Sequence, residues 1–259
     1  INGSEITREM APGHINAVFI KDGNKLLHAD SLSGIIEANK QGGFVFWNHP
    51  NWDSQRKDGI ARLDPFHKFL IDKHLLHGIE VVNEDTYSDE ALKIALDNNL
   101  TILGTSDIHG LTNWKYEISK GGHRPITFVK VASKTPESLK KGLFEGKTVI
   151  WFKDLLVGKE ENVRALISEN IIINSFKYPE DKTIADIEIT NYGAAPIQLE
   201  YLGEYTFHKR PTFFSIPANS TIILNVKTVV KKNEIRLPFR VLNAIVAPKE
   251  YLELSFIAK

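Results

Sequence analysis

Three successive apolar runs of this chain end in polar side chains that can bind ligands, and this repetition constrains the fold most. The runs and the residues that end them are G-F-V-F-W-N-H-P (43–50), G-I-E-V-V-N-E (78–84) and T-I-L-G-T-S-D-I-H (101–109). Stretches of helical periodicity separate them, so predicted strands recur about every 25 to 35 residues, as in βαβ units with a parallel sheet. Because the carboxyl ends of parallel strands meet at one edge, we expect these polar side chains to converge.

The third run ends in an Asp-x-His pair, Asp107 and His109. On extended chain these two side chains point to the same side, and carboxylate and imidazole are both ligands of first-row metals. Taken alone, the stretch favours a simpler interpretation, in which Asp107 caps the next helix and His109 faces solvent. The residues at the other strand ends decide between a pair of metal ligands and a capped strand end.

Capping residues, apolar spacing and β-rich runs predict the remaining elements of an α/β domain over residues 1–165. Helices are predicted over 31–41, 65–77, 88–98 and 135–146, and further strands over 1–5, 17–20, 126–132 and 148–152. Ser31 or Ser33 is expected to cap the first helix, Ser88 the third and Thr135 the fourth. Gly78 is expected to end the second helix.

Beyond about residue 169, the pattern changes to short, alternating β-rich segments separated by Gly, Pro and Asn turns. The strands predicted there cover residues 171–176, 184–191, 197–201, 213–216, 221–229 and 252–257. Such a pattern is typical of a small antiparallel β-sandwich-like domain, which we assign to residues 166–259.

Composition excludes several classes of protein. Thirty-two basic residues balance 32 acidic ones, so no global field favours nucleic acid or a membrane surface. The chain has no cysteine, which excludes disulfides and thiolate metal sites and leaves His, Asp and Glu as ligands. No apolar run approaches the roughly 20 residues of a transmembrane helix, and the first residues do not resemble a signal peptide. We expect a soluble protein, either cytoplasmic or exported.

Five segments in order resemble the polymerase-and-histidinol-phosphatase (PHP) family of metal-dependent phosphoesterases. They are G-S-E-I-T, G-H-I-N, F-W-N-H-P, G-I-E-V-V-N and G-T-S-D-I-H, within residues 3–152. With the β-rich C-terminal region, the chain most resembles the phosphodiesterase-like branch of that family. The resemblance implies a distorted (β/α)7 TIM-like barrel that holds two or three divalent metal ions, usually manganese, zinc or iron.

The resemblance also implies a role for each strand-end residue. Glu5 would bridge two metal ions, and His14 and His49 would complete the shell of the second ion. Asp107 would bind the first ion and His109 the third. Glu5, His49 and Asp107 would then be the catalytic residues of a hydrolase that cleaves phosphodiester, or other phosphate ester, bonds by metal-activated hydroxide.

Other polar residues near these positions are candidates for binding a small-molecule phosphate ester. Arg8 and Arg124 can clamp a phosphate bidentately. Asn48 and Asn83 can line a pocket or orient the ligands, and His123 precedes a predicted strand on the third-metal side. The C-terminal domain carries no catalytic signature and can brace the barrel or form a homo-oligomer interface.

The chain departs from the family in one respect, because no His-x-His motif occurs in it. In the family that motif ends the first strand and supplies two ligands to the first metal. Since the chain also begins inside a predicted strand, we expect the N-terminal segment that carries the motif to be missing. Two alternatives stay open: a phosphomonoesterase of the histidinol-phosphatase type, and a non-catalytic binding protein with a degenerate metal site.

Overall fold

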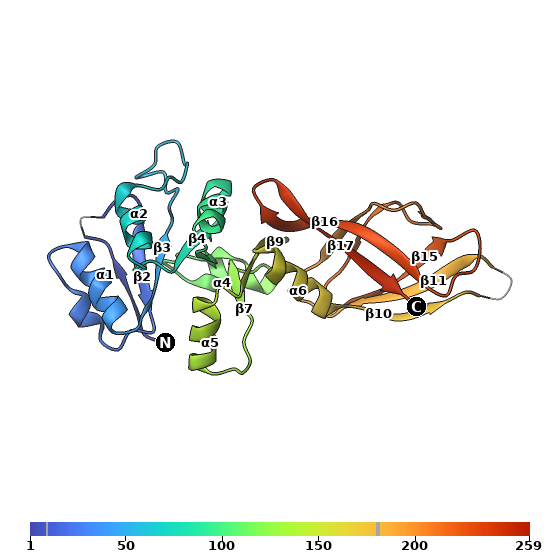
Figure 1. Ribbon diagram of the computed structural model, residues 1–259, viewed down its shortest axis with the longest axis horizontal. Coiled ribbons are helices and arrows are strands. Elements are labelled where there is room, and N and C mark those ends of the chain that lie inside the picture. Colours follow the sequence, from blue (N-terminus) through green and yellow to red (C-terminus); the bar gives the residue numbers. More distant parts are fainter. Residues whose placement is uncertain (9, 180–181) are drawn as a thin grey trace. The chain divides into compact units, whose positions relative to one another are not determined.

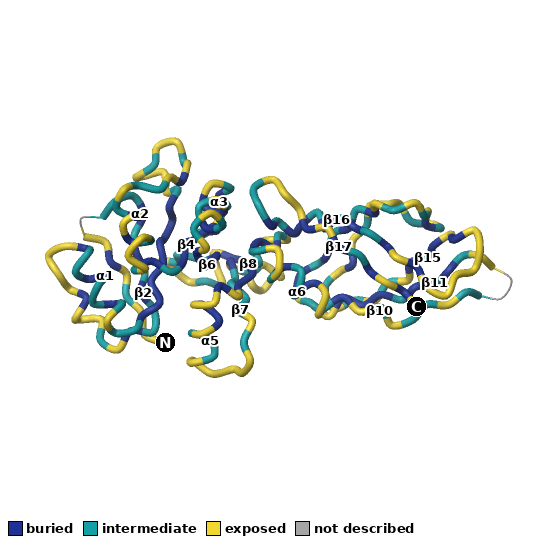
Figure 2. The backbone as a smooth tube through the Cα atoms, viewed as in Figure 1, coloured by how far each residue is buried: buried dark blue, intermediate teal, exposed yellow. Residues whose placement is uncertain are grey.

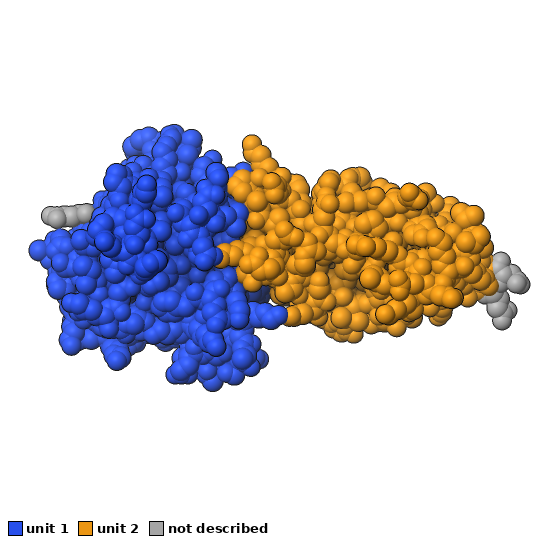
Figure 3. All heavy atoms as spheres, viewed as in Figure 1, with its two compact units in different colours: residues 1–153 blue, residues 154–259 orange. Residues whose placement is uncertain are grey.

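The computed structural model describes residues 1–8, 10–179 and 182–259, and these divide into two compact units. The units comprise residues 1–153 and 154–259 (Figure 3), whereas the sequence pattern places the domain boundary between residues 165 and 166. Each unit has a buried core of its own, seen as the dark segments of Figure 2. All four tryptophans of the chain, Trp47, Trp52, Trp114 and Trp151, belong to the first unit.

The first unit is built on a sheet in the strand order β1-β2-β3-β4-β5, with β6 paired to β4; Figure 1 labels β2, β3 and β4 of this sheet. Its strands are β1 (Gly3–Ile6), β2 (His14–Val18), β3 (Phe44–Asn48), β4 (Gly78–Asn83), β5 (Thr86–Tyr87) and β6 (Thr101–Thr105). β1, β2 and β3 are antiparallel neighbours, whereas β3, β4 and β6 run parallel. The carboxyl ends of the three parallel strands therefore lie at one edge of the sheet, as the sequence predicts.

Helices connect these strands and bury one apolar face each. They are η1 (Gly23–Leu26), α1 (Ser31–Lys40), α2 (Pro65–Asp72) and α3 (Asp89–Asp97). The predicted serine caps of α1 are wrong, because the carboxylate of Asp30 accepts a hydrogen bond from the Ser33 amide. The cap predicted for α3 is confirmed, since Ser88 Oγ accepts from the amide of Ala91. None of the helices in the described part of the chain has the length and apolar character that crossing a bilayer needs.

The second helix is shorter than predicted. α2 ends at Asp72 rather than at residue 77, because His74 adopts a left-handed conformation with φ of 56°. Gly78 does not cap this helix, but it is the first residue of β4, where the predicted strand also begins. His77, between the two elements, accepts a hydrogen bond from the Val45 amide through Nδ1.

In the rest of the first unit, β7 and β8 pack against β6. It contains α4 (Thr112–Lys115), η2 (Ile118–Lys120), β7 (Ile126–Val129), α5 (Pro136–Phe144) and β8 (Thr148–Phe152). Thr127 Oγ1 donates to the carbonyl of Gly104 and accepts from its amide. Gly104 must be small, because a Cβ there would lie 2.5 Å from Ile150 Cγ2. No backbone ladder joins β6 to β8 among the strand pairings of the described residues.

The second unit is a two-sheet β-domain preceded by one helix. Its elements are β9 (Leu155–Gly158), α6 (Glu160–Asn170), β10 (Ile171–Lys177), β11 (Ile184–Asn191), β12 (Ile197–Tyr201), β13 (Thr206–Phe207), β14 (Phe213–Ile216), β15 (Ser220–Lys227), β16 (Ile235–Ala247) and β17 (Glu250–Ala258). One sheet has the order β10-β11-β15-β13. In the other, β16 pairs with β12, β17 and β9. Alternate residues of these strands fill the core, as in the predicted sandwich.

Candidate metal centre

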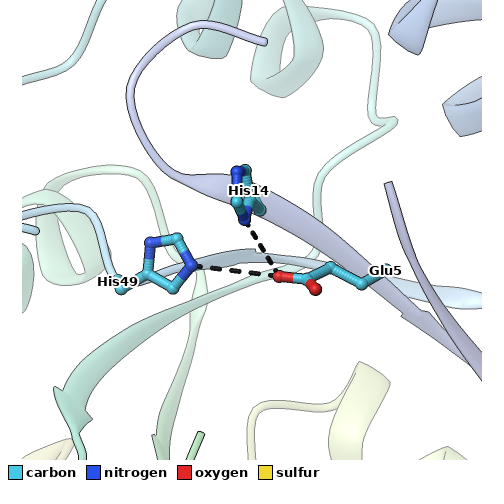
Figure 4. A group of neighbouring side chains, drawn as sticks. All are labelled: Glu5, His14 and His49. Atoms are coloured by element: carbon cyan, nitrogen blue, oxygen red, sulfur yellow. Dashed lines mark hydrogen bonds and ion pairs between the residues drawn. The ribbon is translucent and has the colours of Figure 1, made fainter. Parts of the chain in front are cut away.

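Glu5, His14 and His49 converge at the edge of the first unit's sheet (Figure 4). Glu5 Oε1 lies 3.1 Å from His14 Nδ1 and 3.9 Å from His49 Nε2. One ligand atom of each residue lies within 4.8 Å of those of the other two. Both imidazoles thus face the same carboxylate, although 44 positions separate Glu5 from His49 in the sequence.

Strand register brings the first two residues of this cluster together. Glu5 on β1 pairs with Asn16 on β2, and His14 lies two residues before Asn16, hence on the same face. Gly13, directly before His14, has a φ of 89°, which glycine adopts without strain. A Cβ at Gly13 would lie 2.1 Å from Trp47 Nε1, so only glycine fits this passage of the backbone.

His49 reaches the cluster from the end of the neighbouring strand. β3 ends at Asn48, which pairs with His14 in the β2–β3 register. At His49 itself the backbone turns into the left-handed region, with φ of 29°, and this breaks the strict alternation of the strand. The ring of Trp52 stands edge-on to those of His49 and His14, with centroid distances of 5.1 and 5.9 Å.

The electrostatics of the cluster favour a neutral imidazole at His49. Burial lowers the pKa of His49, and the nearby His14 lowers it further. The carboxylates of Asp107 and Glu5 act in the opposite direction but do not reverse the shift. Because only the neutral imidazole has a free lone pair for a cation, this shift prepares His49 as a ligand at neutral pH.

The donor set and its spacing fit a divalent metal ion. Ligand atoms about 2.0–2.2 Å from a tetrahedral zinc ion lie roughly 3.4 Å from one another. The 3.1 and 3.9 Å separations around Glu5 Oε1 bracket that value. Imidazole nitrogen and carboxylate oxygen are also donors that zinc, manganese and iron accept. The ligand atoms of the two imidazoles lie within 4.8 Å of each other, so an ion bound by all three residues would draw the two rings towards the carboxylate.

Glu80 is a buried acidic residue beside this cluster that the sequence analysis does not single out. Its side chain on β4 is 2% exposed, and burial raises the pKa of its carboxyl group to about 7. Oε2 accepts hydrogen bonds from the His49 amide at 2.8 Å and from Asn83 Nδ2 at 2.9 Å. Oε1 accepts from Thr105 Oγ1 at 2.6 Å. The sequence offers one indication of this site, namely that Glu80 is a charged residue inside the otherwise apolar run G-I-E-V-V-N.

A polar cavity of about 310 Å³ opens at the carboxyl ends of β3, β4 and β6. Its polar lining residues are Asn16, Asn48, Glu80, Thr105, Ser106, Asp107, Arg124 and Thr127. Asn48 connects it to the cluster, because its Nδ2 donates to Glu5 Oε1 at 3.4 Å. Asn48 Oδ1 is buried and has no hydrogen-bond partner in the described part of the protein. The cavity therefore offers a desolvated acceptor to a bound molecule.

The structure does not bring Asp107 and His109 into the three-residue cluster. Asp107 lines the cavity, and its backbone is left-handed, with φ of 41°. The His109 side chain is 85% exposed, and its Nδ1 contacts the Asp107 carbonyl at 2.8 Å. His109 thus lies as the capped-strand interpretation predicts, while Asp107 faces the cavity.

The remaining candidates occupy different positions. Arg124 lines the large cavity, whereas Arg8 lines a smaller one of about 80 Å³ beside Glu5. Asn83 Nδ2 donates a hydrogen bond to Glu80 Oε2. His123 stacks on Trp151 with a centroid distance of 3.8 Å. Both its ring nitrogens contact backbone carbonyls, those of residues 124 and 153, so neither is free for a substrate.

Fold and site together define a two-domain protein with a candidate metal centre in its α/β unit, and comparisons with known proteins agree. The family model of an Ig-like domain matches residues 171–257. A search of curated proteins finds no match. A crystal structure from Bacteroides vulgatus ATCC 8482, of a two-domain protein containing a predicted PHP-like metal-dependent phosphoesterase, matches with a TM-score of 0.89 and 34% identity. The match covers 98% of this chain and 74% of that one. The chain therefore belongs to this family of two-domain PHP-like proteins.

Proposed function

We propose that this chain is a metal-dependent phosphoesterase that hydrolyses a phosphodiester of a small molecule. The observation that carries the proposal is the convergence of Glu5, His14 and His49 on one point beside a polar cavity. Family membership supports it, because the Bacteroides relative is described as a predicted PHP-like metal-dependent phosphoesterase. A divalent cation held there would lower the pKa of a bound water and polarise a phosphoryl oxygen.

Side chains around the cavity can bind the metal ions and the substrate. The three residues of the cluster would hold the ion, and the side chain of Asp107, which lines the cavity and is 34% exposed, would be available to a second ion. Arg124, on the cavity wall, can bind the phosphoryl oxygens of the substrate in a bidentate manner. The unpaired Asn48 Oδ1 can accept a hydrogen bond from a hydroxyl of the substrate.

The charge balance of the cavity supports a diester over a monoester. The cavity is lined by one guanidinium, that of Arg124, and by the carboxyl groups of Asp107 and Glu80, of which Glu80 is only partly ionised at pH 7 because burial raises its pKa to about 7. At pH 7 a phosphate monoester carries a charge of about −1.5 to −2, whereas a diester carries a single negative charge. Bound metal ions would add equal positive charge for either ester, whereas the protein's own lining, with more acidic than basic groups, repels the more highly charged ester more strongly. A phosphomonoesterase of the histidinol-phosphatase type is the alternative.

Family membership also supports finer proposals. We propose a distorted (β/α)7 TIM-like barrel for the catalytic domain, in which β3, β4 and β6 are parallel strands. Two or three ions of manganese, zinc or iron would occupy the site. No nucleic acid or membrane partner is proposed, since the formal net charge is zero. The β-domain is the proposed surface for a homo-oligomer.

The test is metal content together with turnover of two chromogenic esters, bis-p-nitrophenyl phosphate and p-nitrophenyl phosphate. We expect at least one equivalent of bound metal and faster turnover of the diester. His49→Ala and Asp107→Ala should each lower kcat by more than the roughly 10–100-fold that losing a ligand's hydrogen-bond partner costs. His74→Ala, which changes an exposed histidine outside both cavities, is the control. Absence of both metal and turnover would favour a non-catalytic binding protein.

A further inference from the structure

Glu80 joins the ends of three parallel strands. Its two carboxylate oxygens receive hydrogen bonds from the His49 amide after β3, from Asn83 on β4 and from Thr105 on β6. With 2% of its surface exposed, the side chain has little access to water. Burying a carboxylate is costly unless hydrogen bonds replace its hydration. The three donors supply part of that replacement, and they come from the strand ends that form the candidate site.

Two of these strand ends hold residues with unusual backbone geometry. His49 has φ of 29°, and Asp107, two positions after Thr105, has φ of 41°. Non-glycine residues in this region cost about 1–3 kcal/mol and persist where the surroundings enforce them. The bond from the His49 amide to Glu80 is such a restraint on the first residue. The bond from Thr105 to Glu80 restrains the backbone that leads to the second.

We propose that Glu80 is a positioning residue of the metal centre, which fixes His49 in its ligating orientation and sets the course of β6 towards Asp107. The proposal rests on the proposed function, since it assumes that His49 binds a cation. Glu80 acts through the backbone of His49 rather than on the ion, because its Oε2 accepts a hydrogen bond from the His49 amide and not from the His49 ring. Its oxygens therefore act as acceptors, and its charge is not required.

Substitutions at Glu80 separate the acceptor from the charge. Glu80→Gln keeps an acceptor for the His49 amide, while its new NH2 group can donate to Thr105 Oγ1, whose hydroxyl can rotate. Glu80→Met keeps a similar shape but offers no oxygen. Thr105→Val removes one of the three donors, and Thr101→Val is its matched control. Thr101 lies on the same strand, but its hydroxyl donates to the Leu143 carbonyl instead.

Each variant is compared with the wild-type chain in three measurements. The dissociation constant for Mn²⁺ reports ligand geometry, the exchange rate of the His49 amide in metal-free protein reports the restraint, and the unfolding midpoint reports overall stability. We expect Glu80→Met to weaken Mn²⁺ binding by about 10–100-fold, as loss of a ligand's hydrogen-bond partner does. Exchange at His49 should accelerate at least about tenfold. For Glu80→Gln and Thr101→Val, the Mn²⁺ dissociation constant and the exchange rate of the His49 amide should both stay within about threefold of wild type.

Several results would overturn this role. Unchanged Mn²⁺ affinity and unchanged exchange in Glu80→Met would make Glu80 a packing residue. If Glu80→Gln lost as much affinity as Glu80→Met, its charge would be responsible. If Glu80→Met failed to fold, Thr105→Val against Thr101→Val would decide, with weaker Mn²⁺ binding expected in the first alone. If wild type bound no Mn²⁺, the proposed function would fail, and exchange at His49 would still decide whether Glu80 restrains it.

Discussion

His67 is an imidazole with no exposed surface, stacked on Trp47 with a centroid distance of 3.7 Å. Burial lowers the pKa of His67 to about 4. The nearby Asp64 offsets this only in part, because its carboxylate is already paired with Arg56. Neither ring nitrogen has a hydrogen-bond partner in the described part of the chain. The fold therefore favours the neutral form of this histidine, and protonating it costs stability.

The pH dependence of stability follows from this residue. Between pH 6.5 and 4 the unfolded chain binds a proton at His67 that the folded chain does not, so stability is full above pH 6.5 and falls as pH drops. Urea unfolding followed by circular dichroism should show that His67→Phe loses about 2 kcal/mol less than wild type between pH 7 and 5. His77, with a pKa lowered to about 4 by burial, contributes the same trend to both proteins. Equal losses in the two proteins would contradict this prediction.

The positions of individual site residues could be predicted where a sequence motif contains them. They could not be predicted where burial or turn geometry in the fold determines what a side chain does. Resemblance to the PHP family named Glu5, His14 and His49, and the structure brings all three together. Glu80 was missed because a single Glu in a strand usually faces solvent, and its burial follows only from the register of β4 with β6. The exposed position of His109 depends on the turn after β6, which spacing alone does not define.

At the scale of elements, the contact between β6 and β8 offers a clear test. Gly104→Ala would place a methyl group 2.5 Å from Ile150 Cγ2, and such overpacking typically costs about 1–3 kcal/mol. Gly110→Ala is the control, since a Cβ there meets nothing within 4 Å. Denaturant unfolding should show that Ile150→Ala added to Gly104→Ala costs less than the sum of the single changes. Strict additivity would mean that the two strands do not meet as described.

Elements with both a period and a boundary signal were predicted well. The bounds of β4, β8, β11, β12 and β14 agree with those expected from the sequence. α6 was missed, because its N-cap residue, Lys159, makes no side-chain cap. β16 was missed because Pro238 argues against a central strand. The structure accommodates that proline, since β12 pairs with β16 only from Phe239 onwards.

For the whole molecule, the division after Lys153 predicts which fragment is a stable domain. A chain of residues 154–259 should fold alone, whereas 166–259, cut at the boundary expected from sequence, should be less stable by about 3 kcal/mol or more. The shorter fragment lacks β9, which pairs with β16, and the fully buried Val163 of α6. It also loses the bond from Asn243 to the Asp154 carbonyl. Equal thermal unfolding midpoints by circular dichroism would place the boundary at 165.

Trp52 gives the candidate centre an optical signature. Its ring stands 5.1 and 5.9 Å from the two imidazoles of the cluster, and the β-domain contains no tryptophan. All indole fluorescence therefore originates in the unit that would carry the metal. An open-shell ion such as Co²⁺ at the cluster would quench the emission of Trp52 at this range, whereas closed-shell Zn²⁺ would not. The intrinsic tryptophan fluorescence of the protein would thus report whether the centre is occupied and whether the bound ion is open-shell or closed-shell.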